Sequence, residues 1–278
     1  MSPYKHPRIT YGTPADPMPV DLIEEYVEDL AMAIGLSRQP VGVKLILSPE
    51  EYEQADYPEP KTQLAYCSLV ERASRGKAMK TKQVHHKCDG GTTALALESS
   101  NERIESGLEY FSYNLYASPA VARRIRQGVP GLYRYDARTY GIITAPLAEM
   151  EIIPDVVIII ANPYQVMRLT QGNVYHSGER LNISTAAMQA ICAEITIQPY
   201  LTGKMSLSPL CPSTRMLAGW KDDEMAVGLP FEQFIRTVEG VIATINSTDI
   251  KKRKEQIMER FQDRGKILDL SLDNDYEP

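Results

Sequence analysis

The stretch Asp155-Val156-Val157-Ile158-Ile159-Ile160-Ala161-Asn162-Pro163-Tyr164-Gln165 joins a strand to a helix. Its continuous run of Val and Ile is typical of a strand that is buried on both faces. Asn162 and Pro163 then supply an N-cap residue and a proline for the first helical turn, so we expect a helix to begin there. An α/β protein is built from such alternating strands and helices.

About 115 residues earlier in the chain, a strand again runs directly into a capped helix. A helix is expected over residues 20–34, followed by a buried strand over residues 41–47. Ser48-Pro49 then supplies an N-cap and a first-turn proline. Each half of the chain therefore contains the same strand-to-helix unit.

Cysteines extend the match between the two halves. Cys67 lies in an expected helix (63–75) that ends at a Gly-Lys pair, and an expected strand (79–84) leads to Cys88. Cys192 lies in a second expected helix (185–201) that also ends at a Gly-Lys pair, and a strand starting at residue 205 leads to Cys211. A Gly-Leu pair followed by an aromatic residue then comes in each half, at 107–111 and 228–231. Repeated order of this kind indicates an internal duplication.

We therefore predict an α/β fold with a mixed sheet, helices outside it, and two half-units related by a pseudo-twofold axis. The expected divisions are an N-terminal arm and helix (1–38), a first half-unit (39–139), a second half-unit (140–235) and a C-terminal helical extension (236–278). The long amphipathic tail also predicts a homodimer or a higher homo-oligomer.

Composition excludes several classes of protein. The net charge is −6 over 278 residues, so a non-specific nucleic-acid binder is not expected. The longest apolar run is too short to cross a bilayer, and the first twenty residues lack the apolar stretch of a signal peptide. We therefore expect a cytoplasmic protein without a membrane partner, whose four cysteines are reduced thiols or metal ligands rather than disulfides.

Several segments, taken in combination, are distinctive: 40–44, 66–70, 88–91, 154–157, 162–163, 165–168, 200–203 and 222–225. Together they resemble the family of unknown function DUF169. The resemblance covers roughly residues 38–240 and implies no particular activity. The chain departs from the family at Leu210-Cys211-Pro212-Ser213-Thr214-Arg215, where members typically carry a Pro-Cys-x-Gly-x-Arg-like stretch; the cysteine and arginine match and the glycine does not.

The four cysteines are the candidate active centre. A strand advances about 3.3 Å per residue and a helix about 1.5 Å, so a helix followed by a shorter strand returns the second cysteine to the level of the first. If the halves pack about a twofold axis, Cys67, Cys88, Cys192 and Cys211 converge. Thiolates suit iron–sulfur clusters, here a 4Fe-4S cluster, while zinc is less expected without a Cys-x-x-Cys hook. Alternatively, the cysteines are small buried apolar residues.

Five other residues are candidates for the site. Lys44 interrupts an apolar strand, so it either faces solvent at a sheet edge or faces a site. His86 and His176 are candidate proton donors, with surface positions as the alternative. Arg168 and Arg215 are candidates for binding substrate, with salt bridges as the alternative.

Tyrosines gather in the middle of the chain, where they line either an aromatic-ligand pocket or, as we favour, an interface. They are Tyr110, Tyr113, Tyr116, Tyr133, Tyr135 and Tyr140.

The predicted function is that of a cysteine-ligated metalloprotein that acts on a small anionic or aromatic molecule under reducing conditions. An iron–sulfur-dependent lyase, reductase or sulfur-transfer enzyme fits this description. Two alternatives remain open, a metal-free small-molecule binding protein with structural cysteines and a metal-free thiol redox catalyst.

Overall fold

The computed structural model describes residues 20–135 and 137–272, so the predicted arm before residue 20 and the last six residues lie outside it. The strands are β1 (Val41–Ile46), β2 (Met79–Lys82), β3 (Gly141–Pro146), β4 (Val156–Ala161), β5 (Ser206–Ser208) and β6 (Met225–Pro230). The longer helices are α1 (Val20–Ile34), α3 (Tyr66–Ala73), α7 (Pro119–Gly128), α8 (Pro163–Ser177), α11 (Phe231–Ala243), α13 (Lys251–Asp263) and the π-helix η4 (Ala190–Ile197). The shorter ones are α2 (Pro49–Gln54), α4 (Asp89–Ala94), α5 (Glu102–Glu105), α6 (Leu108–Ser112), α9 (Gln198–Thr202), α10 (Pro212–Ala218), α12 (Ile245–Thr248), η1 (Gln83–His85), η2 (Leu132–Tyr135) and η3 (Leu147–Glu149).

All six strands form one sheet with the order β2-β3-β1-β4-β6-β5. Every pairing between these strands is antiparallel. The class is therefore α/β with helices outside the sheet, as expected, but the expectation of a mixed sheet was wrong. The reason lies in the connections: β1 and β2 run parallel but are separated by β3, and β4 and β5 run parallel but are separated by β6. Each half is thus a split strand–helix–strand unit with an antiparallel strand in its gap.

The two halves of the sheet have the same strand arrangement about its centre. Counting outward from the central β1–β4 pair, the first three strands take the positions β1, β3, β2 and the last three take β4, β6, β5. The central pair is antiparallel, with Gly42 opposite Val157. This order is the one that two equivalent half-units would give; their common origin by duplication stays a prediction.

Three details of the predicted repeat differ from the structure. β3 lies between β1 and β2, although the expected boundary at residues 139/140 puts it in the second half-unit. The two Gly-Leu pairs are not equivalent, because Gly107 precedes helix α6 whereas Gly228 lies within β6. The helix that contains Cys192 begins at residue 190 rather than at 185.

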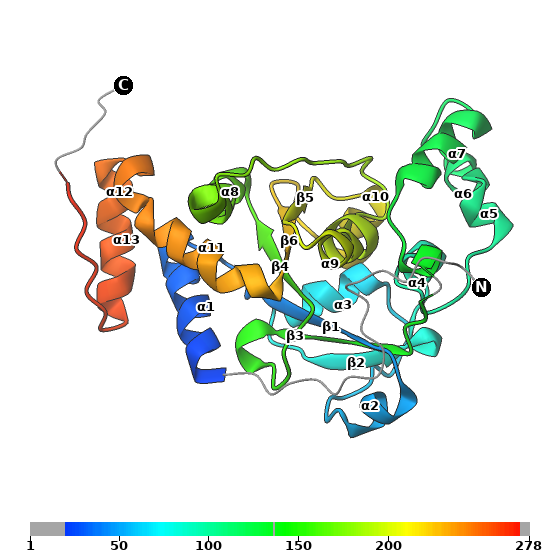
Figure 1. The fold of residues 1–278 in the computed structure, drawn as a ribbon, viewed down its shortest axis with the longest axis horizontal. Helices are drawn as coiled ribbons and strands as arrows, with labels where there is room; N and C mark the ends of the chain where they lie inside the picture. Colours follow the sequence, from blue (N-terminus) through cyan, green and yellow to red (C-terminus); the bar gives the residue numbers. More distant parts are fainter. Residues whose placement is uncertain (1–19, 136, 273–278) are drawn as a thin grey trace.

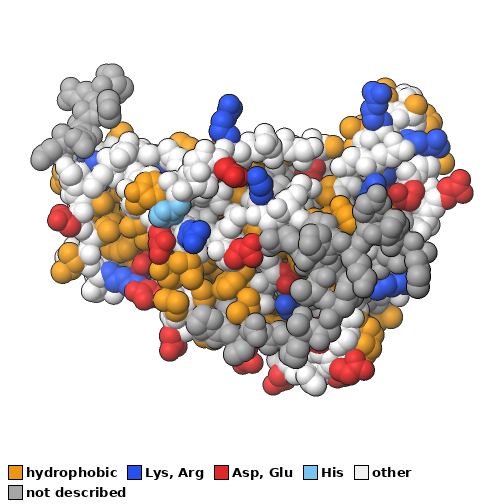
Figure 2. Space-filling view, viewed as in Figure 1, with side chains coloured by type: hydrophobic (Ala, Val, Ile, Leu, Met, Phe, Trp, Pro, Cys, Tyr) orange, Lys and Arg blue, Asp and Glu red, His pale blue; other side chains and the backbone are white. Residues whose placement is uncertain are grey.

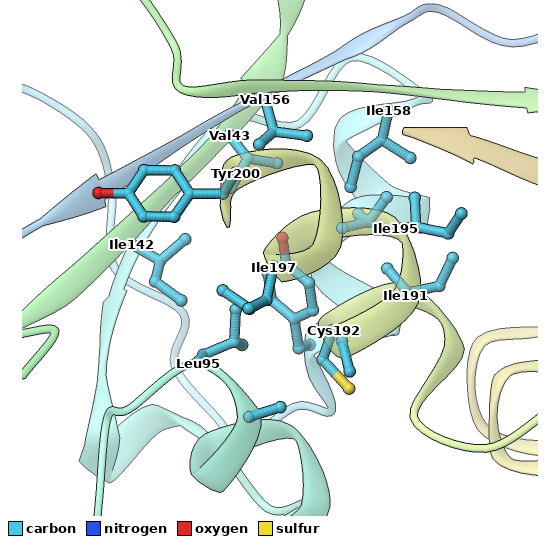
Figure 3. Close-up of a cluster of buried hydrophobic side chains, with 14 of the residues drawn as sticks. Val43, Leu95, Ile142, Val156, Ile158, Ile191, Cys192, Ile195, Ile197 and Tyr200 are labelled. Atoms are coloured by element: carbon cyan, nitrogen blue, oxygen red, sulfur yellow. The ribbon is translucent and has the colours of Figure 1, made fainter. Parts of the chain in front are cut away.

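Alternate residues of each strand serve two hydrophobic cores on opposite faces of the sheet. Val156, Ile158 and Ile160 of β4 belong to a core shared with α3, α4 and η4 (Figure 3). Val157 and Ile159 belong to a second core shared with α1, α8, α11 and α13. Because helices cover both faces of the sheet, every residue of β4 is buried. This explains the continuous apolar run from which the strand was predicted.

A close approach fixes η4 against the sheet. A Cβ atom on Gly228 of β6 would overlap the carbonyl oxygen of Ile195 in η4. Only glycine allows the helix backbone to come this near to the strand. η4 carries Cys192, so this contact sets the depth at which that sulfur lies.

The expected C-terminal extension (236–278) is mostly helical where the structure describes it, and it contains most of α11 followed by α12 and α13. The chain turns around Asp249, whose carboxylate pairs with the Arg168 guanidinium at 3.3 Å while both side chains are fully buried. This pair holds the turn against α8. In Figure 1, α12 and α13 lie at one end of the molecule and α5, α6 and α7 at the other. Among the described residues, no helix combines the length and apolar character needed to cross a membrane.

Candidate functional site

All four cysteines line one pocket of about 460 Å³ on the face of the sheet that η4 covers. Cys67 lies on α3 and Cys192 on η4, while Cys88 and Cys211 are the N-cap residues of α4 and α10. Each half therefore contributes one cysteine from a helix between its first and second strands and one from the start of an α-helix after its second strand. The four cysteines thus share one pocket, and their role as ligands stays a prediction.

Cys192 lies at the border of the hydrophobic core. Figure 3 shows it on η4 below Ile191 and Ile195, with its sulfur pointing away from the strand residues Val156 and Ile158. Cys192 is 8% exposed, and the other three cysteines are partly buried; none of the four forms a disulfide. The core thus supports one side of the pocket, and the sulfurs form part of its wall.

Hydrogen-bond donors surround the sulfurs. The Thr214 hydroxyl lies 3.1 Å from the Cys211 sulfur and also bonds to Cys67, so it bridges the two halves. Burial raises the pKa of Cys88, and the nearby backbone N–H groups of Gly91 and Gly90 act against that rise. Donors of this kind stabilise thiolates and tune the potentials of metal centres.

Burial dominates the acid–base behaviour of the thiols. Burial, together with the neighbouring Cys211 and Cys88 sulfurs, raises the pKa of Cys67 to about 12. Burial likewise raises the pKa of Cys88, and it raises the pKa of Cys192 well above its ordinary value. Without a cation beside them, these thiols stay protonated at neutral pH.

The described residues form no site for a single metal ion. Within residues 20–135 and 137–272, no three His, Cys, Asp or Glu side chains come together closely enough to hold one. A zinc site needs four ligands within about 2.3 Å of one atom.

The rest of the pocket is mainly apolar, with polar groups at a few points. Helix α6 contributes Tyr110 and Glu109, and the segment before η4 contributes Met188 and Gln189. Of the tyrosines noted in the sequence, Tyr110 and Tyr113 line this pocket, which is the aromatic-pocket alternative rather than the favoured interface.

Two of the predicted groups, His86 and Lys44, have partners of their own. His86 is 6% exposed, and its Nε2 lies 3.0 Å from the Thr81 hydroxyl. Burial, with a contribution from His85, lowers the pKa of His86 to about 4, so the ring is neutral at pH 7. Lys44 pairs with Asp155 at 3.2 Å. Neither His86 nor Lys44 is among the described residues that line the cysteine pocket.

The two arginines serve the protein itself. Arg168 is fully buried and, besides Asp249, donates to the Val241 carbonyl, so its guanidinium is not open to a substrate. Arg215 donates to the backbone carbonyls of Pro209, Lys221 and Glu224. These hydrogen bonds stabilise the loop around Cys211. Arg168 follows the salt-bridge alternative, whereas Arg215 bonds to backbone carbonyls.

His176 lies at a different place. It is nearly half exposed, lies 3.9 Å from Glu239, and lines a separate polar pocket of about 390 Å³ between α8 and α11. Arg180 and Arg236 also line that pocket. The structure does not bring His176 to the cysteines.

Gln189 and Thr214 belong to the cysteine pocket but did not emerge from the sequence. Thr214 falls within residues 210–215, which were noted for their partial match to the DUF169 pattern, so the sequence gave a weak signal for it. The sequence gave no signal for Gln189. Its place in the pocket depends on a left-handed backbone (φ 51°), a conformation that glutamine rarely adopts and that the sequence does not indicate.

Comparisons with known proteins give the family of the chain. No solved structure matches the chain. An uncharacterized protein of Methanocaldococcus jannaschii, MJ0308, is 27% identical over 227 residues, which are 81% of this chain and 95% of that protein. The family model DUF169, described as "Uncharacterised ArCR", matches residues 29–240 and includes all four cysteines. The chain therefore belongs to the DUF169 family.

Proposed function

We propose that this chain is an iron–sulfur protein whose cluster is held by Cys67, Cys88, Cys192 and Cys211. One observation carries the proposal: four cysteines, two from each half and far apart in the chain, line one pocket. A cysteine buried as an ordinary apolar residue has no reason to share a pocket with three others. Thiolates are the ligands that such clusters use.

Electrostatics support the same proposal. Burial raises the pKa values of Cys67, Cys88 and Cys192, and the neighbouring sulfurs act in the same direction, so these cysteines need added positive charge to become thiolates. A cluster supplies that charge and deprotonates its ligands. The raised pKa values of these three cysteines weigh against their use in a metal-free thiol catalyst, because reactive cysteines have lowered pKa values. Zinc fits less well than a cluster, because the sequence has no Cys-x-x-Cys hook.

We further propose that the protein is an enzyme that acts on a small aromatic or otherwise apolar molecule in a reducing compartment. The pocket volume lies within the range of small-molecule sites, and most of its lining is apolar. Asp89 and Glu109 outnumber Lys87 among its charged residues, which favours the aromatic over the anionic substrate class. The cluster would supply electrons or Lewis acidity, as a reductase, lyase or sulfur-transfer enzyme requires.

Oxygen-free purification tests the proposal. The protein should be brown, absorb near 400 nm, and contain iron and acid-labile sulfide in stoichiometric amounts. Changing any one of the four cysteines to serine should lower the iron content, and Met32→Leu, which alters a buried sulfur in the other core, should not. Colourless protein with wild-type stability in all four serine variants would instead establish the metal-free binding protein.

The expected homo-oligomer remains a proposal. Figure 2 shows apolar side chains grouped on the face that carries α1 and α11, with charged side chains around them. Leu22 on α1 is 44% exposed. Light scattering should give a mass of at least two chains; the mass of one chain would contradict the proposal.

A further inference from the structure

The cysteine pocket contains two buried polar atoms that no protein group satisfies. The Tyr110 hydroxyl and the Gln189 side-chain carbonyl oxygen both lack a hydrogen-bond partner, and their residues are only 8% and 6% exposed. Buried polar groups are nearly always paired, because leaving one unpaired costs about 1–3 kcal/mol. Both residues line the pocket.

Neighbouring contacts fix the direction of the Gln189 amide. Its nitrogen donates to the Gly90 carbonyl, so the amide oxygen is the end left over. The backbone at Gln189 is left-handed, as is the backbone at Ala187 two residues earlier. Such backbone is costly for residues other than glycine and persists where the surrounding structure requires it. Here it turns Gln189 into the pocket at the start of η4.

Gly90 makes room for both groups. A Cβ atom at Gly90 would lie 2.8 Å from the Tyr110 oxygen and 3.1 Å from the Gln189 amide nitrogen. Tyr110 and Gln189 therefore converge on the same small region beside α4. Burial, more than the nearby Cys192, raises the pKa of Tyr110, so its hydroxyl keeps its proton and can donate.

We propose that Tyr110 and Gln189 form a subsite for an uncharged amide-type group, in which a carbonyl and an N–H lie side by side on an apolar body. The Tyr110 hydroxyl donates to the ligand carbonyl, and the Gln189 oxygen accepts from the ligand N–H. A carboxylate would be repelled by the Gln189 oxygen, which has no proton to donate to it, and by the acidic Asp89 and Glu109 of the pocket wall. It should therefore bind more weakly than an amide. The subsite names the substrate class of the proposed function. Its role in catalysis rests on that proposed function.

Small probes of one shape test the subsite. Benzamide and benzoate have the same ring and differ in the group that the subsite is to recognise. Titration of the protein followed by ¹H–¹⁵N chemical shifts should show benzamide binding at least about tenfold more tightly than benzoate. Tyr110→Phe and Gln189→Met should each weaken benzamide binding by about tenfold.

A matched control lies on the same segment. Tyr113 lines the pocket too, but its hydroxyl already donates to Glu109, so Tyr113→Phe should leave benzamide affinity unchanged. Tighter binding of benzoate, or benzamide affinity unchanged in both Tyr110→Phe and Gln189→Met, would overturn the subsite.

Iron and sulfide analysis of the same samples separates this inference from the proposed function. A protein with a full cluster that does not discriminate benzamide from benzoate contradicts the subsite alone. A protein without iron that binds benzamide through Tyr110 contradicts the cluster alone.

Discussion

The Tyr66 hydroxyl on α3 lies 3.0 Å from the Thr196 hydroxyl on η4, in the buried interior between the two halves of the chain. Thr196 itself donates to the Ile191 carbonyl, which leaves its oxygen to accept from Tyr66. Tyr66 precedes Cys67, and Thr196 lies one turn beyond Cys192. This bond therefore couples the two helices that carry the first cysteine of each half.

Removing that bond should destabilise the protein modestly. We expect Tyr66→Phe to lower the free energy of unfolding by about 1 kcal/mol, because a buried acceptor loses its donor. Urea unfolding measures the loss, and Tyr175→Phe, at a side chain 52% exposed, is the control. A double-mutant cycle with Thr196→Val should show coupling; additive effects would argue that the bond is absent in solution.

Thr214 should tune the cluster rather than hold it. Its hydroxyl bonds to the Cys67 and Cys211 sulfurs, and such donors stabilise the more negative, reduced state of a cluster. Thr214→Val should keep the iron content and lower the midpoint potential by roughly 40 mV, the equivalent of about 1 kcal/mol for one electron. Thr214→Ser, which keeps the hydroxyl, is the control. Equal potentials in the three proteins would contradict this role.

Gly228 should be sensitive to the smallest enlargement. A methyl group there would collide with the Ile195 carbonyl, so Gly228→Ala should cost about 2 kcal/mol of unfolding free energy. Displacing η4 should also lower the iron content, because Cys192 would move. Gly128→Ala at the end of α7 meets open space and should be close to neutral. Similar stabilities for the two variants would show that η4 does not lie so close to β6.

The buried pair of Arg38 and Glu224 should make stability fall in acid. Their side chains form two hydrogen bonds, of 2.7 and 2.9 Å. Burial acts to raise the pKa of Glu224, but the bonds from Arg38 and from the Lys221 backbone outweigh it and lower the pKa below its ordinary value of 4.5. Because the folded pKa is the lower one, this stabilisation is present above about pH 4.5 and is lost as the pH falls through the folded pKa.

Urea unfolding from neutral pH down to about pH 3.5 measures that loss. Glu224→Gln should cost about 3 kcal/mol at neutral pH, since Arg38 is left buried with only the more distant Glu71, and should show a weaker pH dependence. A pH dependence equal to that of the wild-type protein would mean that Glu224 is not ionised in the folded protein.

The sequence predicted local structure well where one segment alone decides it. The apolar run of β4 and the Asn162-Pro163 cap gave a strand and a helix start that the structure has. α1 also begins and ends as expected. The helix around Cys192 began later than predicted, because Gln189 adopts a left-handed backbone that only its packing against Gly90 explains.

That the four cysteines would share one pocket could be predicted from residue order, because a helix and a returning strand have fixed rises per residue. Which strands would fill the gaps could not, because β3 and β6 are chosen by pairing between distant segments. Tertiary structure alone decided that Arg168 would face Asp249, that Lys44 would face Asp155, and that Tyr110 and Gln189 would enter the cysteine pocket. The direction of a side chain depends on contacts remote in sequence, whereas propensity and periodicity act over a few neighbouring residues.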